Sequence, residues 1–99
     1  MLNINILKDG EKAVYVLEGR LDTSTAPQLE EAVNGNISEL KDISFDFANL
    51  EYISSAGLRV LLSTQKTMNK QGKMVIKNVS EEVMEIFDVT GFSDILTIE

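Results

Sequence analysis

Hydrophobic and polar residues alternate in two segments near the start of the chain. Over residues 2–7, Leu2, Ile4 and Ile6 alternate with Asn3, Asn5 and Leu7, and over residues 13–18 two valines alternate with tyrosine and leucine. A period of two is typical of strands with one buried face. The KDGEK segment between them contains Asp9–Gly10, a strong signal for a tight hairpin turn. The pattern predicts an antiparallel pair of strands, and Gly19 is expected to end the second.

The next segment predicts a short amphipathic helix. Leu29, Ala32 and Val33 form a narrow apolar stripe, and Asn34–Gly35 is a suitable C-terminal stop. Pro27 fits the first turn, where its missing N–H costs little. The candidates for the N-cap are the hydroxyl residues Thr23, Ser24 and Thr25.

The stretch FDFANLEYISSAGLRVLLSTQKTM predicts a strand, a loop and a long helix. Ile43, Phe45 and Phe47 alternate with polar residues, which indicates a buried strand, and residues 48–53 are expected to form a short loop. The helix is expected from Ser54–Ser55 to about Gln71, with Gly72 as its stop. Its apolar stripe consists of Leu58, Leu61, Gln65 and Met68, with Leu62 at its edge.

This helix begins with two adjacent hydroxyls, on Ser54 and Ser55. The first backbone N–H groups of a helix have no partner within it and favour anions. The start of the helix is therefore a suitable place for a phosphoryl group.

The last third of the chain predicts a strand, a helix and a strand. KMVIK at residues 73–77 reads as a short buried strand, and Ser80 is expected to cap a helix that ends at Gly91. Ile95, Leu96 and Ile98 are expected to form a last short strand. The predicted order is β β α β α β α β, and right-handed crossovers make most of such a sheet parallel. The expected fold is α/β, with a mixed sheet that opens on an antiparallel hairpin and has helices packed against it.

Composition narrows the class of protein. The 99 residues suit one domain, over residues 1–99. The net charge of −7 disfavours nucleic-acid binding, which needs a basic footprint. No apolar run approaches the roughly 20 residues of a membrane span, and the N-terminus lacks the pattern of a signal peptide. These features predict a soluble, cytoplasmic protein.

The residue types present exclude most catalytic sites. The chain has no Cys and no His, which removes thiolate chemistry, Ser–His and Cys–His pairs, and the commonest metal ligand. Neither glycine-rich motif that cradles nucleotides occurs. The acidic pairs Glu30–Glu31 and Glu81–Glu82 lie where solvated helix charges are expected. We therefore expect a protein that is not an enzyme and that uses no metal or cofactor.

Position alone leaves Ser54 and Ser55 with two interpretations. Serines at a helix start are usually caps, each worth about 1 kcal/mol. A functional hydroxyl is favoured by the nearby Gly57. A glycine there lowers the stability of the helix by up to about 1 kcal/mol relative to alanine, so its presence needs a reason. Either a partner that comes close or close packing on the chain's own sheet explains that glycine. The outward face of the helix also carries a basic stripe, although a solvated surface explains its two lysines better: Ser55, Arg59, Ser63, Lys66 and Lys70.

The segment YISSAGLRVLL, which comes after a predicted strand ending in Asp46–Phe47, resembles the signature of STAS domains, in particular the stand-alone bacterial anti-sigma factor antagonists (anti-anti-sigma factors). The resemblance extends over nearly the whole chain. GRLDTSTAPQLEEAV is similar to the family's first helix and the loop before it, and GKMVIKNVSEEVMEIFDVTGFSDILTI is similar to its C-terminal part.

The resemblance implies a partner-switching function. In the family, this module binds an anti-sigma factor that is also a GHKL-type serine kinase, and binding releases a sigma factor. The kinase phosphorylates a serine at the start of this helix, which ends the binding, and a PP2C-type phosphatase reverses it. Ser55 aligns with that serine, and the adjacent Ser54 is the rival acceptor. Ser54 stands where the family often has Asp, and Ala56 where it has a second hydroxyl. The resemblance and the outward face together give the expected partner surface: Asp22, Thr23, Ser54, Ala56, Gly57, Arg59 and Ser63.

Two other functions stay open at this point. One is a STAS module used as a scaffold in a larger assembly and never phosphorylated. The other is a small-ligand or nucleotide-binding STAS domain. Co-purification with a large complex without a phosphoform would favour the scaffold, and a thermal shift with nucleotides would favour the ligand-binding module.

Overall fold

Two strands form the hairpin expected at the start of the chain. In the computed structural model, which describes residues 1–99, β1 (Leu2–Asp9) pairs antiparallel with β2 (Lys12–Leu21). Gly10 lies in the turn with φ of 63°, a left-handed conformation that glycine adopts without steric cost. The prediction that β2 ends at Gly19 is wrong. The pairing with the next strand shifts register next to Gly19, which has φ of 106°, and β2 continues to Leu21.

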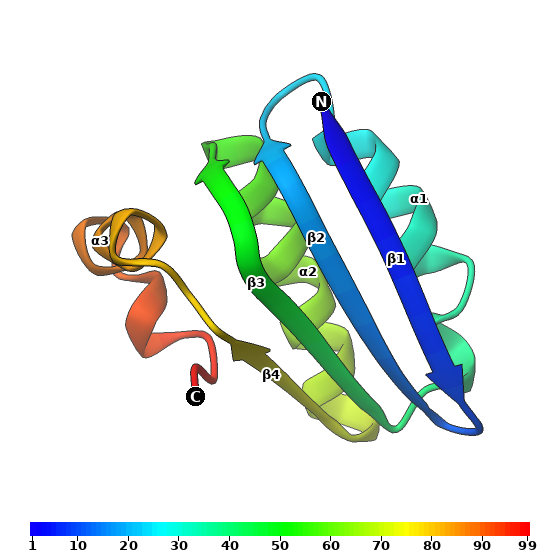
Figure 1. Cartoon of the computed structure of the whole chain (residues 1–99). Helices are drawn as coiled ribbons and strands as arrows, with labels where there is room; N and C mark the ends of the chain where they lie inside the picture. The colour runs from blue at the N-terminus through cyan, green and yellow to red at the C-terminus, as the bar shows by residue number, and fades with distance from the viewer.

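The central strand is longer than the sequence pattern predicts. β3 (Asp42–Ile53) includes residues 48–53, which were expected to be a loop. These residues continue to pair with β2 after the register shift, so Ile53 lies opposite Leu21. Irregular pairing of this kind breaks the alternation by which strands are recognised. β4 (Lys73–Lys77) pairs parallel with β3, and the sheet order is β1-β2-β3-β4 (Figure 1).

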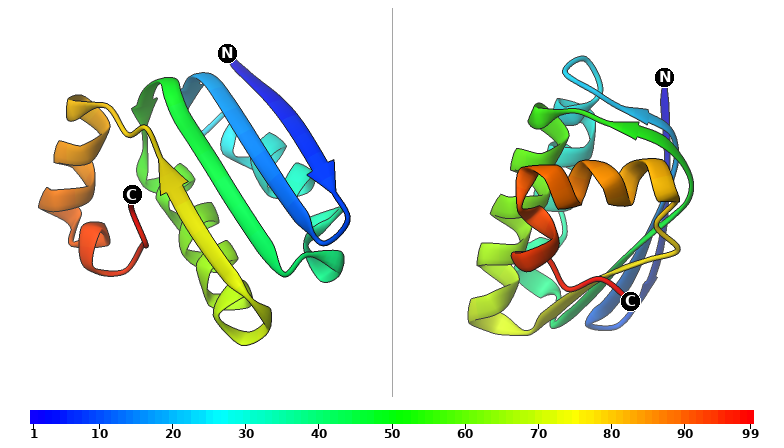
Figure 2. Two further views of the ribbon diagram at one scale, coloured as in Figure 1. Left: turned by 60° about the horizontal axis from the view of Figure 1, so that its bottom comes forward. Right: turned by 90° about the vertical axis from the view of Figure 1, so that its left-hand side faces the viewer.

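Two helices cover one face of this sheet. α1 (Ala26–Asn34) and α2 (Ser55–Gln71) lie side by side behind the strands, and the short 3-10 helix η1 (Ile37–Glu39) follows α1 (Figure 1). α3 (Glu81–Thr90) lies beyond the β4 edge and runs crosswise to α2 (Figure 2). The other face of the sheet carries no helix. No helix in the structure is both long enough and apolar enough to cross a membrane.

The last predicted strand does not form. After Gly91, whose φ of 81° ends α3, the chain makes the 3-10 helix η2 (Phe92–Asp94). Only one bridge follows, between Ile76 and Ile98. Ile95 and Leu96, which were expected in the strand, instead donate their amides to the Phe92 carbonyl at 3.0 and 2.9 Å, so the turn of η2 continues through them. The observed order of strands and α-helices is therefore β β α β α β α, and the predicted eighth element, a strand, is absent.

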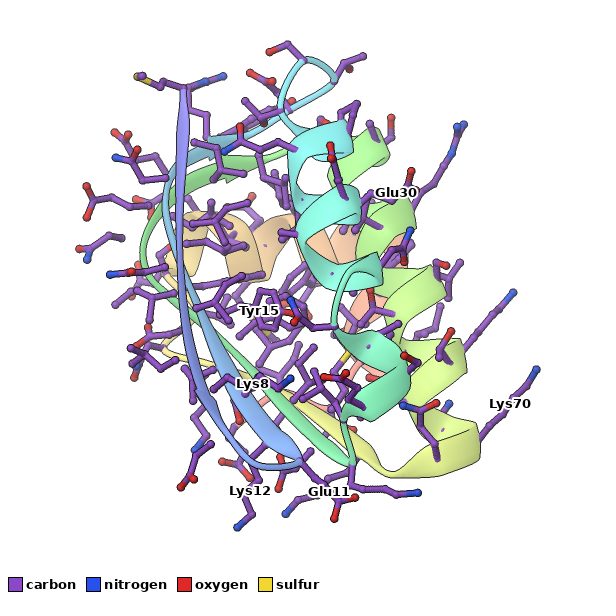
Figure 3. All side chains as sticks on the ribbon, turned by 90° about the vertical axis from the view of Figure 1, so that its right-hand side faces the viewer. Lys8, Glu11, Lys12, Tyr15, Glu30 and Lys70 are labelled. Carbon is purple, nitrogen blue, oxygen red and sulfur yellow. The ribbon has the colours of Figure 1, made fainter.

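The core lies between the sheet and its helices. Four aromatic rings run through it in sequence, Tyr15, Phe45, Phe47 and Phe87, with neighbouring centroids 5.4, 6.1 and 6.4 Å apart. Tyr15 lies between the sheet and α1 (Figure 3), and its hydroxyl donates to the carbonyl of Ala32 at 3.3 Å. The rings link α1, the sheet and α3 into one core.

Candidate functional site

Two loops meet at one end of the sheet. The β2–α1 loop contains Asp22 and Thr23, and the β3–α2 connection contains Ser54. Because β2 and β3 are parallel, both connections leave the same end of the sheet. The Ser54 amide donates to the carbonyl of Leu21 at 2.8 Å. The structure thus brings together the two segments that the family resemblance placed near each other.

The side chain of Asp22 fixes its own loop, because its carboxylate accepts several hydrogen bonds from the residues that follow. Its Oδ1 accepts from the Ser24 hydroxyl at 2.7 Å, the Ser24 amide at 3.0 Å and the Thr25 amide at 3.1 Å. These bonds, above all that from the Ser24 hydroxyl, lower the pKa of Asp22 below its usual value. Asp22 therefore shapes the loop, in which Thr23 and Ser24 are both exposed.

Of the three N-cap candidates for α1, Thr25 occupies the position, but its side chain does not cap the helix. The Thr25 hydroxyl instead donates to the carbonyl of Arg20 at 2.9 Å and accepts from the Asp22 amide at 2.8 Å. These bonds tie the start of α1 to the end of β2 and so hold the loop against the sheet.

Ser54 and Ser55 differ in their environment. Ser54 is the N-cap of α2, and its hydroxyl accepts from the Gly57 amide at 3.5 Å. Ser55 is the first residue of α2, is exposed, and its hydroxyl makes no hydrogen bond within the chain. The prediction that Ser55 lies in the first turn with its hydroxyl reachable from solvent is confirmed. The amides of Ser55 and Ala56 also lack an acceptor, as expected in a first helical turn.

Gly57 does not lie on the surface where it was expected. It is buried, and a Cβ added to it would lie 2.7 Å from Leu21 Cγ and 2.9 Å from Ile53 Cγ1. The glycine is needed because α2 packs closely on the strand ends. Of the two explanations that the sequence allowed, close packing on the chain's own sheet is correct.

Three of the other predicted surface residues, Thr23, Ala56 and Arg59, line a small groove. Arg59 and Ser63 are exposed and Ala56 is half-buried. Glu30 lies on α1, and Lys70 extends into solvent near the far end of α2 (Figure 3). The groove, about 190 Å³, lies between the first turns of α1 and α2, and its lining residues are Thr23, Ala26, Pro27, Glu30, Ala56, Arg59 and Val60.

Sequence reasoning missed one contact at this end of the molecule. The Arg20 guanidinium lies 4.6 Å from the centre of the Tyr52 ring, and the two residues are paired in register on β2 and β3. Both side chains are exposed. The parallel register, which the irregular pairing hid, is what places them together.

The family model and the relatives that match this chain agree on one family. The family model described as STAS domain matches residues 3–99. The anti-sigma-B factor antagonist of Bacillus subtilis (strain 168) is 33% identical over 100 residues, covering 98% of this chain and 92% of that protein. The protein of the same name from Staphylococcus epidermidis is 32% identical over 99 residues, with 98% and 92% covered.

Solved structures share the fold. An anti-sigma factor antagonist from Mycobacterium paratuberculosis superposes with a TM-score of 0.89 at 19% identity, covering 99% of this chain and 85% of that one. SpoIIAA in its unphosphorylated form gives a TM-score of 0.77 at 18% identity, with 98% and 87% covered. The phosphorylated form of the Bacillus cell fate determinant SpoIIAA gives 0.77 at 19% identity, with 98% and 91% covered.

Proposed function

We propose, because this chain belongs to the STAS-domain family of anti-sigma factor antagonists, that it binds an anti-sigma factor and so releases a sigma factor, and that phosphorylation of Ser55 ends this binding. The observation that carries the switch is the exposed Ser55 hydroxyl, free of hydrogen bonds, at the first position of α2. Phosphorylation requires a hydroxyl that another protein can reach, and this one also lies where a helix favours an anion.

Ser55 is a better acceptor than its neighbour. The Ser54 hydroxyl caps α2 and is half-buried, so a phosphate there would disturb the cap and meet the chain's own atoms. The Ser55 side chain has no such constraint. A phosphate adds about −1.5 to −2 charges at neutral pH, which changes the interface without removing any contact of the fold.

The partners follow from the family resemblance. The proposed kinase is the anti-sigma factor itself, of the GHKL type, and the proposed phosphatase is of the PP2C type. Asp22 holds the loop that presents Thr23. Ala56 and Arg59 line the same groove as Thr23, and Ser63 lies further along the outward face of α2. We place this exchange in the cytoplasm, where sigma factors act.

The test is phosphorylation and binding with purified components. The chain is incubated with ATP and each GHKL-type anti-sigma factor of the organism that encodes it, and the modified residue is identified by mass spectrometry. The expected product carries one phosphate on Ser55, and Ser55→Ala binds the same anti-sigma factor but is not modified. Phosphate on Ser54 would move the site by one residue. No phosphate on either, with a kinase active on another substrate, would end the switch proposal and favour a scaffold role.

A further inference from the structure

Both arginines of the chain lie at the Ser55 end of the molecule. Arg20 is the next-to-last residue of β2 and pairs in register with Tyr52, which precedes the N-cap Ser54 by two positions. Arg59 lies one turn along α2 from Ser55, on the side of the groove with α1. The two guanidinium groups therefore flank the β3–α2 turn, one from the sheet and one from the helix layer.

Neither arginine is neutralised by a carboxylate. The three ion pairs in the structure all use lysine, and they join Lys8 to Glu39, Lys73 to Asp42 and Lys77 to Glu99. In a chain with a net charge of −7, two unpaired arginines at one end make an exception to the overall charge.

The surroundings hold these side chains without using their donors. Arg20 lies 4.6 Å from the ring centre of Tyr52, and such stacking orients a guanidinium while leaving its edge free. Arg59 forms a wall of the groove, and Glu30, on the opposite wall, makes no ion pair with it. Carboxylates are the groups that an arginine fork binds best in a protein partner.

We propose, building on the proposed function, that Arg20 and Arg59 bind an acidic segment of the anti-sigma factor on either side of Ser55, and that a phosphate on Ser55 competes within the chain for Arg59. Residues four apart on a helix face each other, so the phosphate of residue 55 lies within reach of the Arg59 guanidinium. Once that pair forms, Arg59 is occupied and the dianion repels the partner's carboxylates. Phosphorylation thus removes the attraction between Arg59 and the partner, and it adds a repulsion between the phosphate and the partner's carboxylates.

The binding half is tested by calorimetry with the anti-sigma factor that binds in the assay above. Arg20→Gln and Arg59→Gln are each expected to weaken binding by about tenfold or more. Lys66→Gln is the matched control, because it removes the same charge from the same exposed helix face further from Ser55, and it is expected to bind within about twofold of the wild type. Wild-type affinity in Arg20→Gln or Arg59→Gln, or equal weakening in Lys66→Gln, would overturn the arginine pair.

The phosphate half needs no partner, so its failure is distinguishable from failure of the proposed function. Phosphoserine is incorporated at position 55 by genetic encoding, and its phosphorus resonance is followed against pH. The second pKa of phosphoserine is ordinarily about 6. Pairing with Arg59 is expected to lower this pKa, Arg59→Gln is expected to restore it, and Lys66→Gln is expected to leave it lowered. Identical titration of Arg59→Gln and the wild type would show that no such competition exists.

Discussion

Gly57 on α2 packs its α-carbon against Leu21 of β2, so closely that a methyl group in place of its hydrogen would approach Leu21 Cγ to 2.7 Å. Leu21 and Ile53 are both fully buried at this contact. The glycine thus sets the distance between the start of α2 and the strand ends. Since Ser55 lies two residues earlier on the same helix, this contact also fixes the distance of the Ser55 hydroxyl from the sheet.

Gly57→Ala is expected to destabilise the fold by about 1–3 kcal/mol, because overpacked sites of this kind force backbone or side-chain shifts. Gly35→Ala is the matched control. Gly35 has φ of −67°, and its added Cβ meets nothing closer than 3.4 Å. That substitution is expected to be neutral or to stabilise by up to about 1 kcal/mol. Urea unfolding of the three proteins measures both effects, and equal stability of Gly57→Ala and the wild type would contradict the close contact.

Substitutions of Ser54 and Ser55 are expected to have different effects on the stability of the protein. Ser54→Ala removes the side-chain cap of α2 and is expected to cost about 0.5–1 kcal/mol, the lower part of the range for caps, because the bond to the Gly57 amide is long at 3.5 Å. Ser55→Ala removes no hydrogen bond and is expected to lie within about 0.5 kcal/mol of the wild type. Thermal unfolding of both variants checks this, and the reverse order would mean that Ser55 is the cap.

The stability of the protein is expected to depend on Asp22 in acid. The pKa of Asp22 is lower in the folded protein than the 3.8 of the unfolded chain, chiefly because the Ser24 hydroxyl donates to the carboxylate. A group with a depressed folded pKa stabilises the fold above its unfolded pKa, and the effect is lost as the pH falls through the folded pKa. Asp22→Asn keeps an acceptor oxygen but not the charge. It should therefore be less stable than the wild type above about pH 4 and approach it in stronger acid.

This comparison is made by urea unfolding between about pH 2 and pH 7. Glu85→Gln, an exposed carboxylate on α3, serves as the control for loss of one negative charge and is expected to follow the wild-type profile. If the profiles of Asp22→Asn and the wild type are parallel throughout, the loop bonds contribute nothing that depends on pH.

The elements whose patterns depend on local sequence were predicted well. The hairpin turn at Gly10, the cap at Ser80 and the stop at Gly91 each depend on one residue type in one backbone conformation. The placement of Ser55 followed from the same kind of signal, because Ser54 caps the helix that Ser55 begins.

The errors arose where pairing across the sheet decides the outcome. Residues 48–53 stay in β3 because they pair with β2 after a shift of register that no local pattern encodes. Gly57 was ambiguous for the same reason, since its contacts with Leu21 and Ile53 exist only once the strands are aligned. The contact of Arg20 with Tyr52 also needs that register. Local sequence thus located Ser55, the proposed acceptor, while the sheet determined what surrounds it.

Phosphorylation at Ser55 is expected to change binding without unfolding the protein. The phosphate would stand at the first position of α2, beside amides of Ser55 and Ala56 that have no acceptor within the chain. A negative group at such a position stabilises a helix by about 0.3–1 kcal/mol. The Ser55 side chain is exposed, so the phosphate displaces no packed atom. The thermal midpoint of the phosphoserine protein is therefore expected to equal or exceed that of the unmodified one.

Ser63 provides the control for this last prediction, because it is exposed on the same helix face but two turns from the N-terminus. Phosphoserine encoded at position 63 lacks the free amides and should not be stabilised by the helix dipole, whose effect falls off beyond the first turn. The modification at 55 should thus give the higher midpoint of the two, with unchanged helix content by circular dichroism. If it instead lowers the midpoint by several degrees, the switch acts by loosening the start of α2. The interface would then be lost through local unfolding rather than through charge at an intact surface.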